Sequence, residues 1–307
     1  MTALRLGTRG SALAMAQSET VAAAIRARTG RQVELVEIVT AGDRSSAPVQ
    51  RLGIGVFVSA LRDALIAKEI DVAVHSYKDL PTAPADGLTI AAVPAREDPR
   101  DALVARDGLT LAELPGGARI GTGALRRIAQ LHALGRHLVP EPIRGNVDTR
   151  LRKVSTGDLD AVVLARAGLA RLGRTDEITE TLDPMLMLPA PAQGALAVEC
   201  RATDTDLVET LTALDDPATR ATVTAERALL ARLAAGCSAP VAALAEAGEA
   251  EDGGLEIYLR GAVFSPDGTQ AIRLSRTGTL AGSAELGHGL AEELLAAGAS
   301  QILGEAP

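Results

Sequence analysis

The stretch "DVAVHSYKDLPT", residues 71–82, changes character halfway along. Three consecutive apolar residues at 72–74 predict a strand that is buried on both faces. Five polar or titratable residues, 75–79, follow at once, and Pro81 ends the stretch. In open α/β sheets, ligands bind outside the carboxyl ends of the strands. The pattern therefore predicts a core strand of an α/β domain with functional side chains at its end.

Short apolar runs alternate with helical stretches on both sides of this strand. Strands are expected at 4–8, 33–40, 71–76 and 88–94, and helices at 11–28 and 56–70. The second helix places a set of apolar residues on one face, at helical spacing: Phe57, Ala60, Leu61, Ala64 and Leu65. This alternation predicts a mostly parallel sheet with helices on both faces.

The alternation restarts after residues 94–101, a stretch rich in Pro and charge that we expect to be a hinge. Strands at 118–122, 138–143 and 160–165, with helices at 123–135 and 146–157, predict a second α/β domain. The late apolar strand within 188–201 is expected to return to the first domain.

The remainder of the chain predicts a small α+β domain. It contains a helix at 216–236, a hairpin at 255–278 around Pro266-Asp267-Gly268, and a closing helix with Leu286, Leu290 and Leu294.

Composition narrows the class of partner. The 307 residues carry 31 basic and 39 acidic side chains, a net charge of −8, with two Phe, two Tyr and no Trp. An acidic chain that is poor in aromatic residues is a poor candidate for nucleic-acid binding. No apolar run approaches the roughly 20 residues of a membrane span, and the N-terminus does not have the pattern of a signal peptide. We therefore expect a cytoplasmic protein without nucleic-acid or membrane partners, and the His and Cys spacing predicts no metal site.

Several expected strands end in basic residues and small polar residues. These are Arg9, Ser11, Thr122, Arg126, Arg127, Arg144, Gly145, Arg150, Arg166 and Arg171. Arginine binds carboxylates and phosphates through paired hydrogen bonds. Any one of these arginines alone would be read more simply as a solvated charge or an ion-pair partner. Their repetition at strand ends instead favours a ligand with many carboxylates.

The two cysteines lie in different surroundings. Cys200 is inside the apolar strand "GALAVECR" and is expected to be a buried structural thiol. Cys237 follows a helix, in the small-residue loop "AAGCSAP", where an accessible thiol could serve as a nucleophile or as an attachment point.

Together these motifs resemble the hydroxymethylbilane synthase (porphobilinogen deaminase) family over essentially the whole chain. The matching stretches are "GTRGSALA", "DVAVHSYKDLPT", "REDPRDALV", "IRGNVDTRL", "LPAPAQGALAVECR" and "TAERALLARLAAGCSAP". The resemblance implies two periplasmic-binding-protein-like (type II) α/β domains plus a small α+β C-terminal domain. The implied boundaries are 1–94 with 195–213, then 99–189, then 216–307.

The resemblance also implies a reaction: four porphobilinogen molecules condense head to tail, each with loss of ammonia, to give linear hydroxymethylbilane for tetrapyrrole biosynthesis. It implies a monomer and a covalent dipyrromethane cofactor that is attached to Cys237 by a thioether. The implied cofactor-binding residues are Lys78, Arg126, Arg127, Arg144, Thr122, Ser76 and Gly145. The implied substrate-binding residues are Arg9, Ser11, Arg150, Arg171 and Gln193. Asp79 is the implied catalytic residue, placed to stabilise cationic pyrroles through their N–H groups.

The chain departs from the family pattern at two places. Gly123-Ala124 stands where the family has two serines, and Ile54 stands where a lysine is usual in the loop "LGIGVF". A family member with impaired catalysis is therefore one alternative. The other is a non-enzymatic carboxylate-binding or anion-binding protein on the same two-domain fold, which would leave Cys237 and the third domain unexplained.

Overall fold

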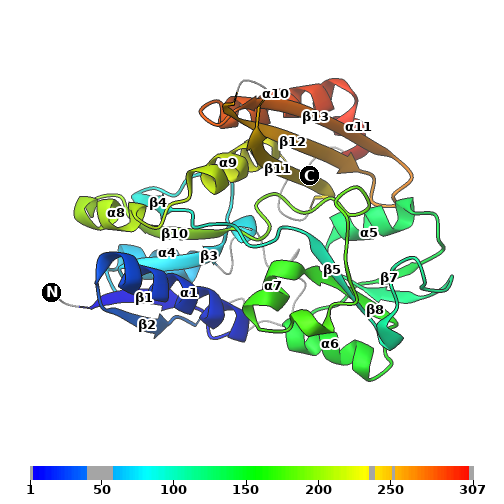
Figure 1. Cartoon of the computed structure of the whole chain (residues 1–307), viewed down its shortest axis with the longest axis horizontal. Helices are drawn as coiled ribbons and strands as arrows, with labels where there is room; N and C mark the ends of the chain where they lie inside the picture. Colours follow the sequence, from blue (N-terminus) through cyan, green and yellow to red (C-terminus); the bar gives the residue numbers. More distant parts are fainter. Residues whose placement is uncertain (1–2, 40–57, 235–238, 251–252, 304–307) are drawn as a thin grey trace. The chain divides into compact units, whose positions relative to one another are not determined.

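The computed structural model describes residues 3–39, 58–234, 239–250 and 253–303. Contacts divide the chain into two compact units (Figure 1). Unit 1 comprises Met1–Glu97 and Ala195–Arg220, and unit 2 comprises Asp98–Gly194 and Ala221–Pro307. The first boundary falls within the expected hinge at 94–101. The division into three domains stays a prediction, because the contacts group the second and third together.

Unit 1 is built on a five-stranded sheet with the order β2-β1-β3-β10-β4. Its strands are β1 (Leu4–Thr8), β2 (Val33–Glu37), β3 (Val72–Ser76), β4 (Leu88–Ala92) and β10 (Leu196–Arg201). β1 pairs in parallel with both β2 and β3, and β10 is antiparallel to β3 and β4. The prediction that the late strand returns to the first sheet is confirmed.

Apolar residues place helices on both faces of this sheet (Figure 1). On one face, α1 (Ala12–Thr29) and α8 (Thr205–Thr212) pack into the cluster that contains Leu6, Val72 and Val198. On the other face, α4 (Ser59–Ile66) contributes Leu61, Ala64 and Leu65 of the predicted apolar face. α4 is shorter than the predicted helix at 56–70, and Phe57 lies outside the described residues.

Unit 2 repeats this topology in a second sheet, with the order β7-β6-β8-β5-β9. Its strands are β5 (Asp101–Ala105), β6 (Arg119–Gly121), β7 (Val139–Glu141), β8 (Ala161–Ala165) and β9 (Glu180–Thr181). One face is covered by α5 (Leu125–Ala133), the other by α6 (Val147–Ser155) and α7 (Arg166–Arg171). In both sheets one antiparallel strand, β10 or β5, is inserted beside the third parallel strand.

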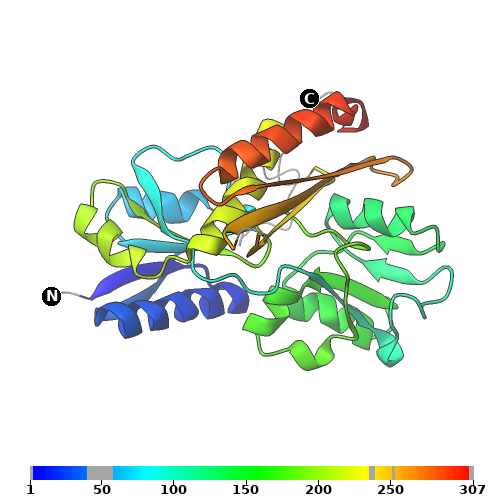
Figure 2. The same ribbon diagram turned by 45° about the horizontal axis from the view of Figure 1, so that its top comes forward.

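The C-terminal part of unit 2 is a three-stranded antiparallel sheet with helices on one face. β11 (Val241–Glu249), β12 (Leu255–Phe264) and β13 (Ala271–Thr279) pair in sequence order. Figure 2 shows α10 (Ser283–Ala296) lying along this sheet, and its Leu286, Leu290 and Leu294 enter a core shared with α9 (Pro217–Arg232). α11 (Ala299–Leu303) follows α10. The predicted fold class, two α/β sheets with helices on both faces plus a small α+β part, is confirmed.

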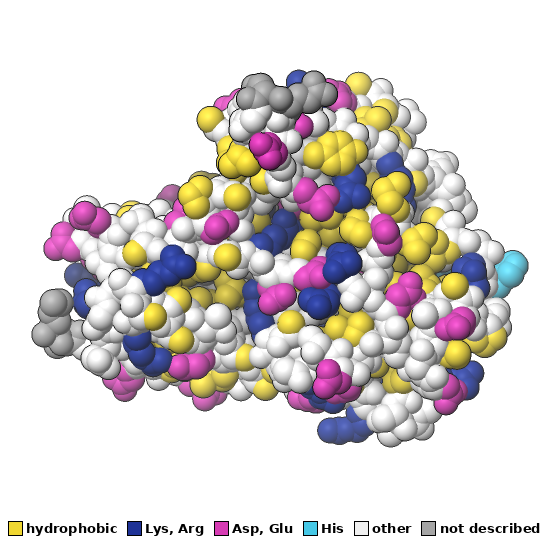
Figure 3. Space-filling model, viewed as in Figure 1, with side chains coloured by type: hydrophobic (Ala, Val, Ile, Leu, Met, Phe, Trp, Pro, Cys, Tyr) yellow, Lys and Arg dark blue, Asp and Glu magenta, His cyan; other side chains and the backbone are white. Residues whose placement is uncertain are grey.

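Three of the described strands were absent from the sequence-based expectations: β5, β11 and the two-residue β9. β5 lies directly after the expected hinge, and β11 reads "VAALAEAGE". Alanine-rich segments carry little intrinsic strand preference, so burial against neighbours decides their conformation. On the face shown in Figure 3, basic and acidic side chains are interspersed, as is normal for a solvated surface.

Candidate functional site

Asp79 lies at the end of the core strand that opened the sequence analysis. β3 ends at Ser76, and a single 3₁₀ turn, Tyr77–Asp79, follows it. The Asp79 side chain is exposed, and among the described residues nothing forms a hydrogen bond or an ion pair with its carboxylate. Among the described residues, Asp79 neither pairs with Lys78 nor caps the turn through its side chain. The carboxylate is available to a ligand.

The end of β1 lies beside the end of β3, because the two strands are parallel neighbours. Arg9 and Ser11 follow β1, and the Ser11 hydroxyl accepts a hydrogen bond from the Ala14 N–H (3.3 Å) as the N-cap of α1. Gln17, buried on α1, donates from Nε2 to the Ser76 hydroxyl (2.8 Å). Sequence analysis missed Gln17. These contacts hold the two strand ends together.

A buried charged cluster supports the same strand from one face of the sheet. Glu199 of β10 is only 1% exposed. Its Oε1 accepts hydrogen bonds from Arg62 of α4, one from Nε (3.1 Å) and one from Nη2 (2.9 Å). His75 Nε2 lies 3.0 Å from Glu199 Oε2. Burial alone would raise the pKa of Glu199, but hydrogen bonds from His75 and Arg62 lower it. The carboxylate stays ionised and joins α4 to His75, near the end of β3.

In unit 2, Arg126 and Arg127 are turned into the protein. Both are on α5 and almost completely buried, and both contact Asp101 at the start of β5. Arg126 Nη2 lies 2.8 Å from Asp101 Oδ2, and Arg127 Nη2 donates to Asp101 Oδ1 (2.7 Å). Burial alone would raise the pKa of Asp101, but the two guanidinium charges hold it well below its usual range. Asp101 was not anticipated from the sequence.

Arg150 is the clearest ligand-binding candidate of unit 2. It is half-buried on α6, and its Nε donates to the Gly145 carbonyl (2.9 Å). Within the described parts of the chain it has no acidic partner. Burial, and after it the like charges of Arg127 and Arg144, lower the pKa of Arg150. A negatively charged ligand would relieve this accumulation of positive charge.

The loop that carries these groups has a constrained backbone. Gly145 has φ +102° and precedes Asn146, whose Oδ1 accepts the Thr149 N–H as the N-cap of α6 (2.9 Å). A side chain at 145 would meet Thr149 at 2.8 Å. Gly145 is therefore needed for the turn that places Arg144 and Arg150 at the end of β7.

The departure from the family pattern at Gly123-Ala124 has a local structural correlate. A Cβ at Gly123 would lie 2.9 Å from the Ile143 carbonyl oxygen, so the two loops after β6 and β7 touch here through backbone. Ala124 is the N-cap of α5 and makes no side-chain cap hydrogen bond. Thr122 is buried, and its hydroxyl accepts the Ala124 N–H (3.4 Å).

Gln193 lies in the segment that precedes β10, and Arg171 contacts that segment. Gln193 is buried, and its Nε2 donates to Asp101 Oδ1 (2.8 Å) and to the Pro99 carbonyl (2.7 Å). Arg171 Nη2, at the end of α7, donates to the Gly194 carbonyl (2.6 Å). The structure thus brings Gln193, Arg126 and Arg127 together around one carboxylate.

The cysteine prediction is confirmed for Cys200, which is fully buried; burial raises the pKa of its thiol to about 11. Cys237 and Ile54 lie outside the described residues.

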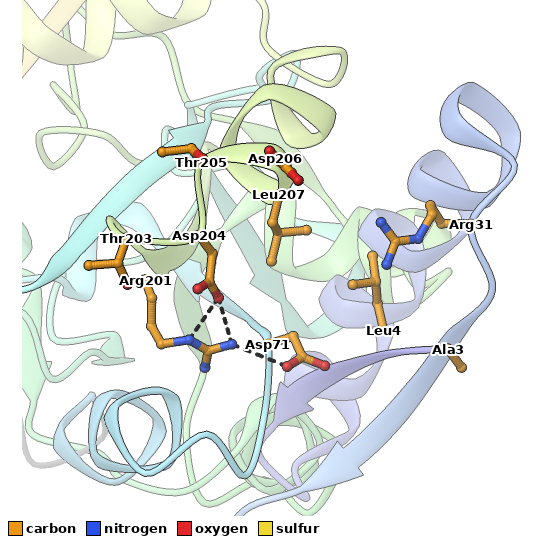
Figure 4. Close-up of a pocket in the computed structure, with 10 residues that line it drawn as sticks. All are labelled: Ala3, Leu4, Arg31, Asp71, Arg201, Thr203, Asp204, Thr205, Asp206 and Leu207. Atoms are coloured by element: carbon orange, nitrogen blue, oxygen red, sulfur yellow. Dashed lines mark hydrogen bonds and ion pairs between the residues drawn. The ribbon is translucent and has the colours of Figure 1, made fainter. Parts of the chain in front are cut away.

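A pocket of about 410 Å³ opens at the opposite edge of the unit 1 sheet, near the start of β1 (Figure 4). Its main charged group, Arg201, is already bound to Asp71 (3.2 Å) and Asp204 (2.7 Å). In the described part of the chain, no helix is long and apolar enough to cross a membrane, and no group of His, Cys, Asp or Glu side chains could hold a metal ion.

Fold and site together define an α/β protein with two sheets of like topology, whose strand ends carry arginines and, at Asp79, a carboxylate that no described residue contacts by a hydrogen bond or an ion pair. Residues 4–209 match the family model described as "Porphobilinogen deaminase, dipyromethane cofactor binding domain". Residues 220–296 match "Porphobilinogen deaminase, C-terminal domain". The chain belongs to the porphobilinogen deaminase family.

Curated relatives agree over nearly the full length. The porphobilinogen deaminase of Nocardia farcinica is 61% identical over 308 residues, which cover 99% of this chain and 89% of the relative. That of Mycobacterium tuberculosis (strain H37Rv) is 60% identical over 304 residues, 98% of each chain. Among solved structures, a periplasmic substrate-binding protein of an ABC transporter from Coxiella burnetii is 14% identical, with a TM-score of 0.45 over 71% of this chain and 94% of that one.

Proposed function

We propose that this chain is a hydroxymethylbilane synthase. In each cycle the bond between the aminomethyl carbon of porphobilinogen and its nitrogen breaks, and ammonia leaves. A carbon–carbon bond forms to the free α-position of the terminal pyrrole, which then loses a proton. After four cycles, the bond that joins the four new rings to the primer would break by hydrolysis: water supplies the hydroxyl group of linear hydroxymethylbilane, and the primer regains a proton at its free α-position. Family membership supports this reaction, and the side chains described above can be assigned to its steps.

The observation that carries the proposal is Arg150, a half-buried guanidinium that has no acidic partner among the described residues. Each porphobilinogen ring bears an acetate and a propionate, so the ligand gains two carboxylates per cycle. Arg144 and Arg150 lie at the edge of a strand-end loop and have the chemistry to bind such groups in pairs. In this proposal Arg9, Ser11, Arg150, Arg171 and Gln193 bind substrate.

The hydrogen-bond donors of the strand ends also fit a dipyrromethane cofactor, which carries four carboxylates. Held as a thioether on Cys237, the cofactor would supply the free pyrrole position to which the first substrate couples. The proposed holding residues are Lys78, Ser76, Thr122, Arg126, Arg127, Arg144 and Gly145. Arg126 and Arg127 are shared with Asp101, so they would present only their remaining N–H groups.

Asp79 is the proposed catalytic residue. Loss of ammonia leaves a cationic methylene-pyrrole, and its N–H is a donor that a free carboxylate can accept. The exposed Asp79 carboxylate, without a competing partner among the described residues, supports this role. It could also take the proton that the coupled ring loses. A monomeric, cytoplasmic enzyme is part of the proposal, to be checked by light scattering and cell fractionation.

Intact-protein mass spectrometry tests the proposal most directly. The enzyme should carry the added mass of a dipyrromethane and should convert porphobilinogen into hydroxymethylbilane. Cys237→Ser should lose the added mass, whereas Cys200→Ser should keep it. A chain that binds porphobilinogen without added mass or turnover would instead be an anion-binding protein.

A further inference from the structure

Residues 188–194, "LPAPAQG", form a segment of unit 2 that we call the connecting segment. Its first residue joins it to α5, because the Leu188 carbonyl accepts Arg126 Nη1 (2.5 Å). Its second joins it to β11, because the Pro189 carbonyl accepts the Ala243 N–H (3.1 Å). The segment therefore lies between the C-terminal sheet and the helix that carries the buried arginines.

Glu226 of α9 fixes the middle of this segment. The side chain is fully buried, and its two oxygens accept different backbone N–H groups. Oε2 accepts from Ala192 (2.5 Å) and Oε1 accepts from Ala245 of β11 (2.7 Å). Ala192 has φ +61°, in the left-handed region that a residue with a Cβ adopts only when its surroundings hold it there. A charge-assisted bond to its N–H is such a constraint.

The residue after Ala192 is Gln193, whose amide reaches Asp101 Oδ1 (2.8 Å). Asp101 in turn holds Arg126 and Arg127. If residue 192 left the left-handed region, the chain direction would change at the next residue and the Gln193 amide would leave Asp101. A series of contacts thus runs from Glu226 through the Ala192–Gln193 backbone and Asp101 to the arginine pair, all of it within unit 2.

We infer that Glu226 is a positioning residue for the carboxylate-binding arginines, acting through the left-handed turn at Ala192. The inference rests on the proposed function in that the arginines are taken to bind the carboxylates of porphobilinogen and dipyrromethane. Glu226 touches neither ligand in this scheme. It sets the direction of Gln193, which donates a hydrogen bond to Asp101 Oδ1, and Asp101 sets the direction of Arg126 and Arg127.

The first test is Glu226→Gln, which keeps the shape of the side chain but turns one acceptor into an N–H₂ group facing a backbone donor. In cofactor-loaded protein the KM for porphobilinogen should rise about tenfold, as expected when binding groups are displaced slightly. Hydrogen exchange of the 188–194 amides should accelerate, a readout that does not depend on activity. Unchanged exchange or an unchanged KM would overturn the inference.

Glu180→Gln is the matched control. Glu180 of β9 also accepts a backbone N–H in unit 2, from Leu111 (2.6 Å), and no hydrogen bond of the described residues links it to Asp101. Its KM should stay at the parent value. A tenfold rise in the control as well would mean that any lost carboxylate in unit 2 has this effect, and the inference would fall.

A second-site change separates the turn from other roles of Glu226. Glycine adopts the left-handed region without steric cost, so Ala192→Gly combined with Glu226→Gln should restore most of the lost affinity. No recovery would show that Glu226 acts by another route.

If Glu226→Gln does not fold, Glu226→Asp replaces it, because aspartate keeps the charge but has a shorter reach. It should show the same rise in KM, and a normal KM there would overturn the inference. A parent protein without adduct or product would refute the proposed function instead, while the exchange measurement would still test the turn.

Discussion

Arg126 and Asp101 form a buried ion pair in unit 2: Nη2 lies 2.8 Å from Oδ2, and their side chains are 4% and 0% exposed. Removing one member of such a pair leaves the other charge buried without compensation. We expect Asp101→Asn to lower the free energy of unfolding by about 3–5 kcal/mol. Urea unfolding measures this, with the exposed Asp107→Asn as a control that should change it little.

The same pair predicts a pH dependence. The folded-state pKa of Asp101 is depressed, so its contribution to stability is present above the unfolded value of about 4 and is lost as the pH falls through the folded one. The difference in stability between the parent and Asp101→Asn should therefore shrink steadily below about pH 5. A constant difference down to pH 3 would contradict the assignment.

Serine substitutions at Gly123 and Ala124, which depart from the family pattern, should change the stability of the protein in opposite directions. Ala124→Ser supplies a hydroxyl at the N-cap of α5 and should raise stability by about 0.5–2 kcal/mol. Gly123→Ser brings a Cβ within 2.9 Å of the Ile143 carbonyl and should lower it. Thermal midpoints of the two single variants provide the comparison. Equal gains at both positions would show that the loops move apart readily.

Arg150→Gln should affect binding far more than folding. Its guanidinium has like-charged neighbours and no described acidic partner, so removal should change the unfolding free energy by less than about 0.5 kcal/mol. The KM for porphobilinogen should rise about tenfold or more, the value of one charge-assisted hydrogen bond. The exposed Arg232→Gln, whose partner is Glu292, serves as the control for loss of a surface arginine. A large fall in stability with normal KM would assign Arg150 a structural role.

Asp79→Asn keeps the size of the side chain and removes its charge. If the carboxylate stabilises cationic pyrroles, the rate of hydroxymethylbilane formation should fall roughly a hundredfold or more, with the thermal midpoint nearly unchanged. The measurement is steady-state turnover by folded, cofactor-loaded variant. Near-normal turnover would remove Asp79 from the catalytic assignment.

Cys200 should be unreactive in the folded protein. Burial raises the pKa of its thiol to about 11, so almost none is thiolate at neutral pH. In Cys237→Ser, treatment with iodoacetamide should add mass only after denaturation. Rapid labelling of the native variant would mean that Cys200 is accessible.

Periodicity and strand-end chemistry predicted much of this fold. The parallel strands β1, β3, β6 and β8 could be predicted because they are short apolar runs flanked by helices. β5 and β11 could not, because alanine-rich strands are defined by the neighbours that bury them rather than by their own preference. The hairpin of β12 and β13 was predictable from local turn chemistry alone.

The sequence predicted which residues belong to the candidate site better than it predicted the contacts that they make. Arginines at strand ends were expected to face a ligand, and for Arg150, which has no acidic partner among the described residues, this stays a prediction. Arg126 and Arg127 are instead shared with Asp101, a contact between residues far apart in the sequence. No local pattern reports such a contact. The acid in "REDPRDALV", directly before an apolar run, was the one available signal, because a charge that enters a strand needs a partner.

The position of β10 between β3 and β4 imposes an order of events during translation. β10 begins at Leu196, so the strand that joins β3 to β4 in the first sheet leaves the ribosome after residues 93–195 have been made. All five strands of the second sheet lie within that intervening stretch. Since domains fold as units, the second sheet can be complete while β3 and β4 still present unpaired edges. Nascent chains that stop short of residue 196 should therefore be the aggregation-prone species, and ribosome-bound fragments of increasing length should gain protease resistance in unit 2 first.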